Sequence, residues 1–272
     1  MRLRDAVALG VLGALLAAGC SRLTFVKPNA SRGDYTQVAP EYTFKDDAAS
    51  DQRYAASARV LSAQQYLGAG QLDKAAAEAN AALKIDSHSA AAHTLLGVIE
   101  EQQGRSAQAG THYARAAELE PERGTMLNNY GAWLCGNGRA AESLPLFDRA
   151  LQDPGYPTPA AALANAGSCA LIIGDLARAE RYLRAALSMD PVNPVALAAM
   201  AEHEYRTGRY LDARAFSQRR LAAAPSAPAV LILASQIEKK LGDMAAADRY
   251  VQQLRTEFPQ APTVPPGEGS QR

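Results

Sequence analysis

Residues 163–191 read LANAGSCALIIGDLARAERYLRAALSMDP, and residues 197–225, which begin 34 positions later, read LAAMAEHEYRTGRYLDARAFSQRRLAAAP. Each stretch begins with leucine and has a small residue four positions on, Gly167 or Ala201. A glycine, Gly174 or Gly208, follows seven positions after the small residue. Both stretches end in proline. Apolar residues recur at three- and four-residue steps on either side of this glycine, which is the period of an amphipathic helix. Each stretch therefore predicts two helices joined by a short turn at the glycine.

The turn glycine recurs along most of the 272-residue chain, at intervals of 34, 34, 36, 34 and 34 residues: Gly70, Gly104, Gly138, Gly174, Gly208 and Gly242. This period is that of the tetratricopeptide repeat, in which each period forms one antiparallel helix pair. Such arrays present an extended concave surface to partner chains and have no built-in reaction centre. We therefore predict an all-α, right-handed superhelical solenoid of six tetratricopeptide (TPR) helix-turn-helix repeats that binds another protein.

Three further columns keep the register of the glycines. Small residues lie seven positions before each glycine (Ala63, Gly97, Gly131, Gly167, Ala201, Ser235) and five positions after it (Ala75, Ala109, Ser143, Ala179, Ala213, Ala247). Small side chains there allow the two helices of a repeat to approach closely. From the second repeat on, proline follows the glycine by 17 residues, or by 19 in the third repeat: Pro121, Pro157, Pro191, Pro225 and Pro259. Proline ends the second helix because it lacks an N–H and disfavours helix in the preceding residue.

The spacing also sets the expected boundaries. We expect the array to occupy residues 52–259, with repeats at about 56–89, 90–123, 124–159, 160–193, 194–227 and 228–259. The third repeat should be irregular, because its linker at 152–160 is proline-rich and longer than the others. Pro145 also lies within its second helix, where only the first turn accommodates proline at little cost.

Residues 1–19 have the form of a signal peptide. Arg2 and Arg4 precede a stretch at 6–18 that carries no charge and is too short to span a bilayer. The stretch leads into Leu16-Ala17-Ala18-Gly19-Cys20, which resembles the lipobox of bacterial lipoproteins, where the cysteine is acylated and becomes the new N-terminus. Acylation of Cys20 would supply two or three chains, enough for stable membrane anchoring. The alternative is an ordinary secretory signal peptide cleaved at a small-residue site.

The segments that flank the array lack a helical period. Residues 20–51 are polar and contain Pro28, Gly33 and Pro40, so we expect a flexible tether that carries the lipidated cysteine. Residues 260–272 are rich in proline and glycine and are expected to form a disordered tail. Ser21 follows the cysteine in place of the aspartate that favours inner-membrane retention. We therefore expect an outer-membrane lipoprotein that faces the periplasm of a Gram-negative bacterium.

Composition argues against other classes of function. The net charge is zero and Lys and Arg are scattered, so nucleic-acid binding is not expected. The sequence contains no phosphate loop, nucleophile elbow or zinc motif. Its four histidines show no i, i+4 pair of metal ligands: His88, His93, His112 and His203. We predict no catalytic residue, no metal site, no cofactor and no small-molecule substrate.

Two cysteines lie late in the first helices of neighbouring repeats. Cys135 and Cys169 could form a disulfide across the irregular linker in an oxidising compartment. The alternative is a pair of small buried side chains with free thiols. Neither cysteine has an adjacent acid–base pair or a redox Cys-x-x-Cys motif, so a catalytic role is not expected.

The third repeat resembles that of a known family. Residues 127–135 read LNNYGAWLC and are followed by Gly138-Arg139, Ala150-Leu151 and Pro154-Gly155-Tyr156-Pro157. This run is similar to the third-repeat signature of the type IV pilus biogenesis lipoproteins, the PilF/PilW-type secretin pilotins. The likeness covers roughly residues 50–260, together with the lipobox and the count of six repeats. Its most specific part is the run Asn128, Asn129, Tyr130 and Gly131.

The resemblance implies a periplasmic lipoprotein of the outer membrane, anchored in lipid through Cys20. In that family the partner is the pilus secretin, whose outer-membrane localisation or assembly into a multimeric pore the lipoprotein promotes. An alternative is a TPR scaffold lipoprotein for another envelope machine, serving barrel assembly or the recruitment of cell-wall hydrolases. An enzyme with an unrecognised site is the remaining alternative, and no constellation of residues favours it.

The geometry of TPR arrays also predicts where a partner would bind. The first helix of each repeat should line the concave side of the array. In the first two repeats the candidate contacts are Val60, Gln64, Leu67, Thr94, Val98 and Glu101. An ordinary packing role is the alternative for the apolar members of this set.

Overall fold

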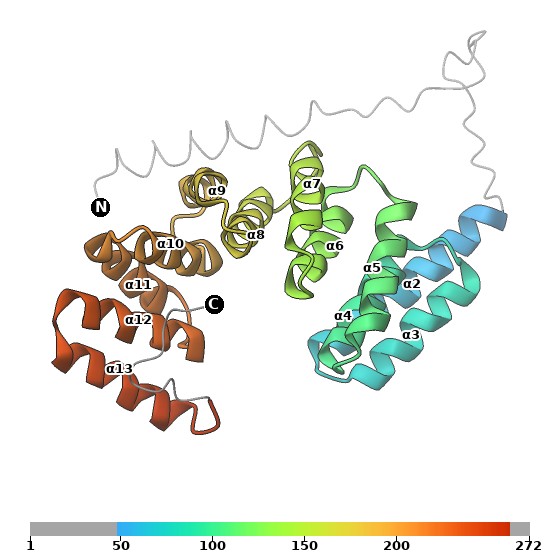
Figure 1. Ribbon diagram of the computed structural model, residues 1–272. Helices are drawn as coiled ribbons and strands as arrows, with labels where there is room; N and C mark the ends of the chain where they lie inside the picture. Colours follow the sequence, from blue (N-terminus) through green and yellow to red (C-terminus); the bar gives the residue numbers. More distant parts are fainter. Residues whose placement is uncertain (1–47, 262–272) are drawn as a thin grey trace, which may run out of the picture. The chain divides into compact units, whose positions relative to one another are not determined.

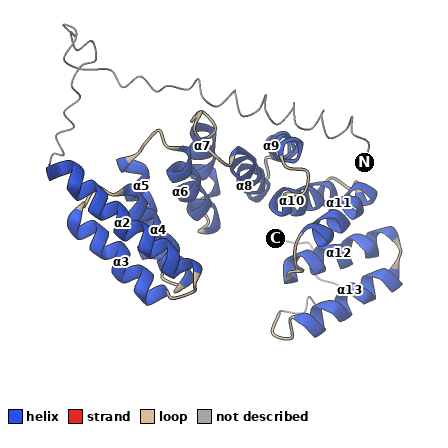
Figure 2. Cartoon of the chain, turned by 180° about the vertical axis from the view of Figure 1, so that it is seen from behind, coloured by secondary structure: helices blue, strands red, loops and turns tan. Residues whose placement is uncertain are grey.

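The computed structural model describes residues 48–261, and within this range it confirms the predicted fold. The described residues form twelve helices and no strand (Figures 1 and 2). In chain order the helices are α2 (Ala48–Gly68), α3 (Leu72–Ile85), α4 (Ala90–Gln102), α5 (Ser106–Leu119), α6 (Gly124–Gly136), α7 (Ala140–Ala150), α8 (Pro159–Ile172), α9 (Leu176–Met189), α10 (Pro194–Arg206), α11 (Tyr210–Ala223), α12 (Pro228–Leu241) and α13 (Met244–Glu257). Each even-numbered helix packs against the helix that follows it, which gives six helix pairs.

The six turn glycines adopt the conformation that the repeat requires. Their φ angles lie between +70° and +83°, in the left-handed region that an L-residue enters only at a cost. At Gly174, for example, the backbone N–H donates to the Leu171 carbonyl at 3.1 Å. The N–H of Asp175 donates to the Ala170 carbonyl at 2.9 Å, so the last turn of α8 is closed by the backbone itself.

The two columns of small residues lie at the contact between the helices of each pair. All six residues that follow the glycine by five positions are fully buried. In the column seven positions before the glycine, a Cβ on Gly167 would come within 2.5 Å of Leu183. The same addition on Gly97 would meet the ring of Tyr113 at 2.6 Å, and on Gly131 the ring of Phe147 at 3.0 Å. A Cβ would therefore overlap the facing side chain of the second helix at Gly97 and Gly167, and would crowd it at Gly131.

Local sequence signals account for the starts of six of the twelve described helices. The side chains of Ser89, Asp175, Asn193 and Asp243 each accept a backbone N–H three residues on, which caps α4, α9, α10 and α13. Pro159, Pro194 and Pro228 lie in the first turn of their helices, where the missing N–H costs nothing.

The third repeat has the expected irregularity. Its second helix, α7, has only 11 residues and contains Pro145. In the linker that follows, the Asp153 carboxylate accepts the backbone N–H groups of Gly124 and Gly155, both at 2.8 Å. These two hydrogen bonds hold the pKa of Asp153 below its usual range. Tyr156, from the same linker, is buried. The longer connection is therefore an ordered part of the repeat.

The array begins earlier than the sequence pattern predicts. Helix α2 starts at Ala48, so the expected boundary between tether and array at residues 51 and 52 lies inside a helix. Alanines 48 and 49 favour helix, and Asp51 is favourable in a first turn because it faces the positive end of the helix dipole. The predicted signal peptide, Cys20, most of the tether and residues 262–272 of the tail lie outside the described residues.

The core is spread along the array instead of forming one central body. One buried cluster extends from Cys135 to Met200, and a second joins α2 to α4 between Val60 and Leu96. No helix within residues 48–261 has the length and apolar character that crossing a membrane would require.

Candidate protein-binding surface

The predicted groove residues of the first repeat lie on α2, at different depths. Val60 is only 8% exposed and belongs to the buried cluster between α2 and α4, with Leu67 packed against it. Gln64 is exposed on the same helix. Val60 therefore serves the core, and Gln64 is the member of this set on α2 that a partner could reach most easily.

The predicted groove residues of the second repeat lie on α4. Two of them have hydrogen-bond partners within the array. The Thr94 hydroxyl donates to the Ala90 carbonyl at 2.9 Å and lies 3.0 Å from the Met126 sulfur, which belongs to α6. The Glu101 carboxylate accepts the hydroxyl proton of Tyr113 at 2.7 Å. Val98 lies between them in sequence and is partly exposed.

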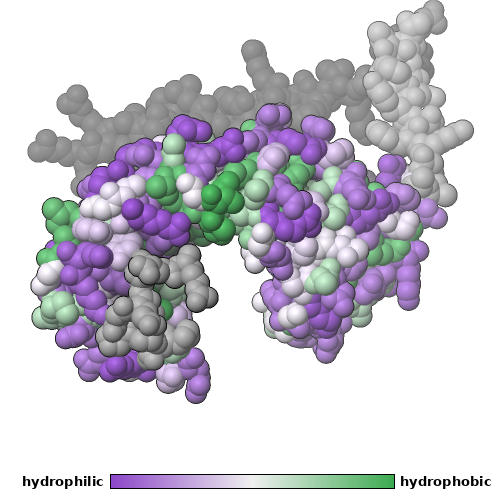
Figure 3. Space-filling model, viewed as in Figure 1, coloured by the Kyte–Doolittle hydropathy of each residue, from purple (hydrophilic) through white to green (hydrophobic). Residues whose placement is uncertain are grey.

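An apolar groove lies further along the array, on repeats four to six. Its volume is about 500 Å³. It is formed by α8, α10, α11 and α12 and is lined by Ser168, Leu171, Ile172, Pro194, Val195, Ala198, Ala199, Ala201, Glu202, Arg206, Ser217, Arg220, Ala229, Val230 and Leu233. Ile172 and Val195 remain 62% and 45% exposed. Figure 3 shows apolar side chains gathered over the middle of the described array.

This groove uses the helix face that the sequence predicts, but in later repeats. Leu67 and Glu101 lie three residues before their turn glycines, and so does Leu171 of the groove. Glu202 lies six residues before its glycine, as Gln64 and Val98 do, and Ala198 lies ten residues before, as Val60 and Thr94 do. Ala198 and Ala199 of α10 leave open space, because the first two repeats carry larger side chains at the same positions: Val60 and Leu61, and Thr94 and Leu95.

The charged groups at the rim of the groove have hydrogen-bond partners within the array. Arg206 donates from Nε to Glu202 at 2.6 Å and from Nη1 to the Leu171 carbonyl at 2.7 Å. Arg220 donates to the carbonyls of Ala224 and Pro225. Because these charges already have partners, the groove offers mainly apolar contact, which suits a partner segment with apolar side chains.

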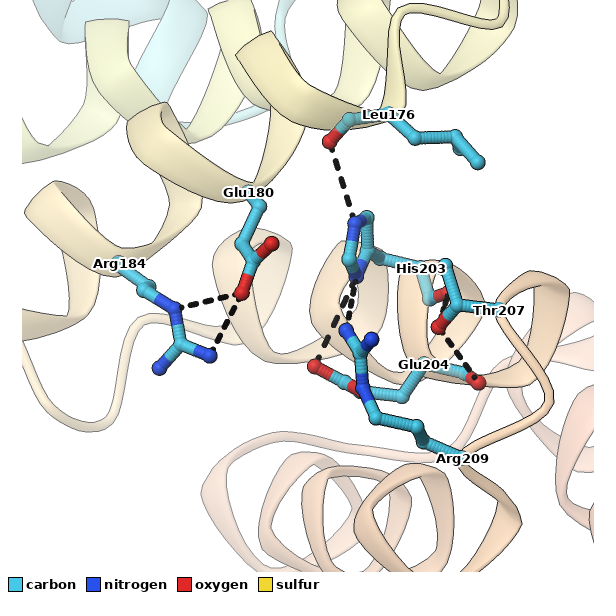
Figure 4. A network of polar contacts seen from close by, with 7 residues as sticks. All are labelled: Leu176, Glu180, Arg184, His203, Glu204, Thr207 and Arg209. Atoms are coloured by element: carbon cyan, nitrogen blue, oxygen red, sulfur yellow. Dashed lines mark hydrogen bonds and ion pairs between the residues drawn. The ribbon is translucent and has the colours of Figure 1, made fainter.

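A buried polar network holds α10, one of the helices that line this groove (Figure 4). His203 and Glu204 are each 2% exposed. The Glu204 carboxylate pairs with Arg209 across the turn, and the carbonyl of Leu176 lies 3.2 Å from His203 Nε2. An Arg209 Nη2 lies 3.4 Å from His203 Nδ1. Since a carbonyl only accepts, His203 Nε2 donates to Leu176, while Nδ1 also lies 3.6 Å from a Glu204 carboxylate oxygen.

The network gives His203 and Glu204 structural roles. It ties α10 to the start of α9 and to the turn that leads into α11 (Figure 4). A second buried glutamate also pairs with an arginine: Glu238 of α12 pairs with Arg214 of α11. Buried carboxylates with close arginine partners thus hold α10 and α12, two of the helices that form the groove.

The signature residues of the third repeat lie on α6 and make contacts of different kinds. Asn128 on α6 accepts a hydrogen bond from the side chain of Asn165 on α8 at 3.1 Å, and donates to Asn129 at 3.4 Å. Tyr130 stacks on Trp133, with 6.1 Å between ring centroids, and Gly131 faces Phe147. The signature therefore combines helix-packing positions with half-exposed amides.

Cys135 and Cys169 are joined by a disulfide in the structure, with 5.8 Å between their Cα atoms. The bond links α6 to α8 and so bridges the irregular linker between the third and fourth repeats. Both cysteines are buried in the larger core cluster.

Two of the four histidines lie in contact, although their spacing in the sequence predicts no histidine pair. His203 is buried and His88 is exposed, whereas His93 on α4 and His112 on α5 face one another. A search for i, i+4 spacing misses this pair because its members are 19 residues apart on two antiparallel helices. Within residues 48–261, no group of three or more His, Cys, Asp or Glu side chains is placed to hold a metal ion.

The fold and its groove define a class of protein. Tetratricopeptide-repeat family models match residues 60–124, 122–191 and 170–237, so the described array is a TPR scaffold of the kind that mediates protein–protein interaction.

Similarity to individual proteins shows which TPR proteins this chain is related to. The crystal structure of PilW, a widely conserved type IV pilus biogenesis factor, matches with a TM-score of 0.69 and 31% identity, over 76% of this chain and 94% of PilW. The structure of PilF from Pseudomonas aeruginosa matches with a TM-score of 0.67 and 26% identity, over 78% of this chain and 95% of that one. In sequence, the type IV pilus assembly protein PilF of that organism is 27% identical over 194 residues, which are 71% of this chain and 77% of PilF. The chain belongs to the family of TPR proteins that includes the type IV pilus biogenesis factors PilW and PilF.

Proposed function

We propose that this chain is a non-enzymatic lipoprotein of the outer membrane that binds the type IV pilus secretin and promotes its localisation and multimerisation. The observation that carries the proposal is the similarity to PilW and PilF, which extends over 94% and 95% of their structures. The lipobox-like sequence that ends at Cys20 supports the membrane anchor, and the apolar groove supports binding of a protein segment.

The mechanism requires no chemical step. Acyl chains on Cys20 would hold the array at the membrane, and the residues between Cys20 and α2 would set its reach. A secretin segment bound to the array would then have a high local concentration at the membrane. Tethering of this kind favours multimerisation because later binding events become effectively intramolecular.

Deleting the gene tests this function directly. We expect secretin multimers to disappear from semi-native gels, or the secretin to leave the outer-membrane fraction. A Cys20→Ala strain examined alongside shows whether the anchor is required. Normal multimers in the normal location would refute the proposed function.

The apolar groove on repeats four to six is the site we propose for a secretin segment. We expect Ile172→Glu to weaken binding strongly, because a carboxylate would enter the apolar groove without a partner. Leu211→Glu is the matched control, since Leu211 on α11 is 70% exposed and does not line the groove.

A third variant separates this groove from the one predicted in the first two repeats. Val98→Glu changes a partly exposed position of α4. Circular dichroism first establishes that all three variants retain their helices. If Val98→Glu abolishes secretin binding and Ile172→Glu does not, the partner occupies the first repeats and the assignment to the later groove is wrong.

A further inference from the structure

Two imidazoles face each other between the helices of the second repeat. The Nδ1 atom of His93 on α4 lies 3.1 Å from the Nδ1 atom of His112 on α5. The ring centroids are 5.4 Å apart and the ring planes are inclined by 36°. At this separation two nitrogens can share one proton, with one donating and the other accepting.

The other repeats fill these two positions with different chemistry. The positions lie 11 residues before and eight residues after the turn glycine. In the first repeat they hold Arg59 and Glu78, whose side chains form an ion pair at 2.9 Å. From the third repeat on they are apolar or aromatic: Leu127 and Leu146, Leu163 and Tyr182, Leu197 and Phe216, and Leu231 and Tyr250. The fold therefore does not require histidine at either position.

The surroundings of the pair favour neutral imidazoles. Burial lowers the pKa of both histidines, and His112 and Arg115 lower that of His93 further. Glu100 acts in the opposite direction on His112, and a hydrogen bond with the Ser87 backbone does so on His93. A neutral imidazole has a free lone pair, and metal-bound histidines commonly donate their other N–H to a backbone carbonyl.

We propose that His93 and His112 form a two-histidine site for a divalent first-row transition metal ion, with Cu²⁺ bound most tightly. An ion about 2.0–2.1 Å from each nitrogen would have an N–metal–N angle of about 100° at the observed separation. Cu²⁺ is the favoured ion because nitrogen ligands bind it more tightly than its neighbours in the series.

Binding exchanges the shared proton for the metal ion. The proton on Nδ1 moves to the outer ring nitrogen, Nε2, so each histidine stays neutral and both Nδ1 lone pairs face the ion. Water would complete the coordination, since no third His, Cys, Asp or Glu within residues 48–261 is placed to do so. The site is separate from the groove on α8, α10, α11 and α12, and it does not depend on the proposed function.

Titration of the purified full chain with Cu²⁺ tests the proposal, with isothermal calorimetry for the affinity and electron paramagnetic resonance for nitrogen ligation. We expect one equivalent to bind with nitrogen hyperfine structure. The double variant His93→Leu, His112→Leu should bind at least tenfold more weakly. Leucine is the matched replacement because the third repeat has leucine at both positions, so the variant is expected to fold.

The variant His88→Ala is the control, since His88 is exposed and lies outside the pair. It should bind Cu²⁺ as the unaltered chain does. Equal affinity in the unaltered chain and the double leucine variant would overturn the proposal, and so would loss of binding in His88→Ala. Absence of any binding by the unaltered chain would overturn it as well.

Discussion

Two glycines in the third repeat lie two residues apart and have opposite backbone requirements. Gly138 has a φ of +79°, whereas Gly136 ends α6 without a positive φ, and a Cβ would meet nothing within 4 Å at either position. Gly138→Ala should therefore reduce the free energy of unfolding by about 1–2 kcal/mol, the cost of a left-handed L-residue. Gly136→Ala should raise it by about 0.4–1 kcal/mol, because alanine has less freedom to lose on folding. Urea unfolding of both variants measures the two changes, and a loss of similar size in both would contradict this account.

The histidine pair should make the second repeat sensitive to mild acid. The pKa of both His93 and His112 is lowered in the folded chain from about 6.5, so their contribution to stability is present above that pH. It is lost as the pH falls through the folded pKa values, because protonation is then easier in the unfolded chain. We expect the free energy of unfolding to decline between pH 6.5 and 5, and to decline less in the variant His93→Leu, His112→Leu.

The comparison in this window is selective because Asp and Glu residues mostly titrate at lower pH. The charged neighbours Glu100 and Arg115 are unchanged in the double variant, and His203 is present in both proteins. Parallel curves for the two proteins in urea unfolding between pH 7.5 and 5 would show that the pair does not cause the decline.

At the scale of the helix pair, residues on the two helices are matched in size. Gly167 faces Leu183, 16 residues further on, whereas the corresponding positions in the first repeat hold Ala63 and Ala79. Gly167→Ala should cost about 1–3 kcal/mol through overpacking, although alanine is the better helix former. Leu183→Ala alone should cost about 2–5 kcal/mol because it leaves a cavity. The double variant reproduces the first repeat, so its loss should be smaller than the sum. Strict additivity in a double-mutant cycle would exclude this coupling.

The disulfide acts between repeats, since it joins α6 to α8 across the longest linker. It closes a loop with a sequence separation of 34 residues, so its loss should reduce the free energy of unfolding by about 2–4 kcal/mol. The measurement is urea unfolding with and without reductant, together with a count of free thiols. Cys135→Ala, Cys169→Ala should unfold at the same urea concentration in both conditions. If the urea midpoint of the unaltered chain is the same with and without reductant, the disulfide does not make the expected contribution to stability.

How much of the fold the sequence predicts depends on how local the signal is. The turn glycines and the two columns of small residues can be recognised in the sequence. A positive φ and a close approach of two helices each restrict the residue type at a single position. The start of α2 at Ala48 is missed because the residues before Asp51 lack apolar periodicity, although alanine favours helix.

The candidate sites are less predictable, because they depend on how neighbouring helices are placed. The sequence predicts which face of the first helices a partner would contact. It does not show that alanines such as Ala198 and Ala229 leave a groove, with Ile172 exposed beside it. The contact between His93 and His112 likewise depends on the relative rotation of two antiparallel helices. Spacing rules for a single helix cannot detect it.

Over the whole array, stability should be highest in the middle, because each repeat is stabilised mainly by its neighbours. Helices α8 and α10 contribute to the larger core cluster and also pack against each other. Helix α13, in contrast, packs only against α12 among the described helices and buries only Ala246, Ala247 and Leu254. Amide hydrogen exchange followed by mass spectrometry should therefore show the slowest exchange in α8 and α10 and the fastest in α13.

The disulfide separates two explanations for such a gradient. If protection in the middle comes from neighbouring repeats, α8 and α10 should still exchange more slowly than α13 after Cys135 and Cys169 are replaced by alanine. If it came from the cross-link alone, the difference between these helices would disappear in that variant. Because the disulfide joins α6 to α8 and does not include α10, the amides of α10 are the most direct test. Equal exchange rates along the unaltered chain would instead indicate one cooperative unit, and the nearest-neighbour description of the array would then be wrong.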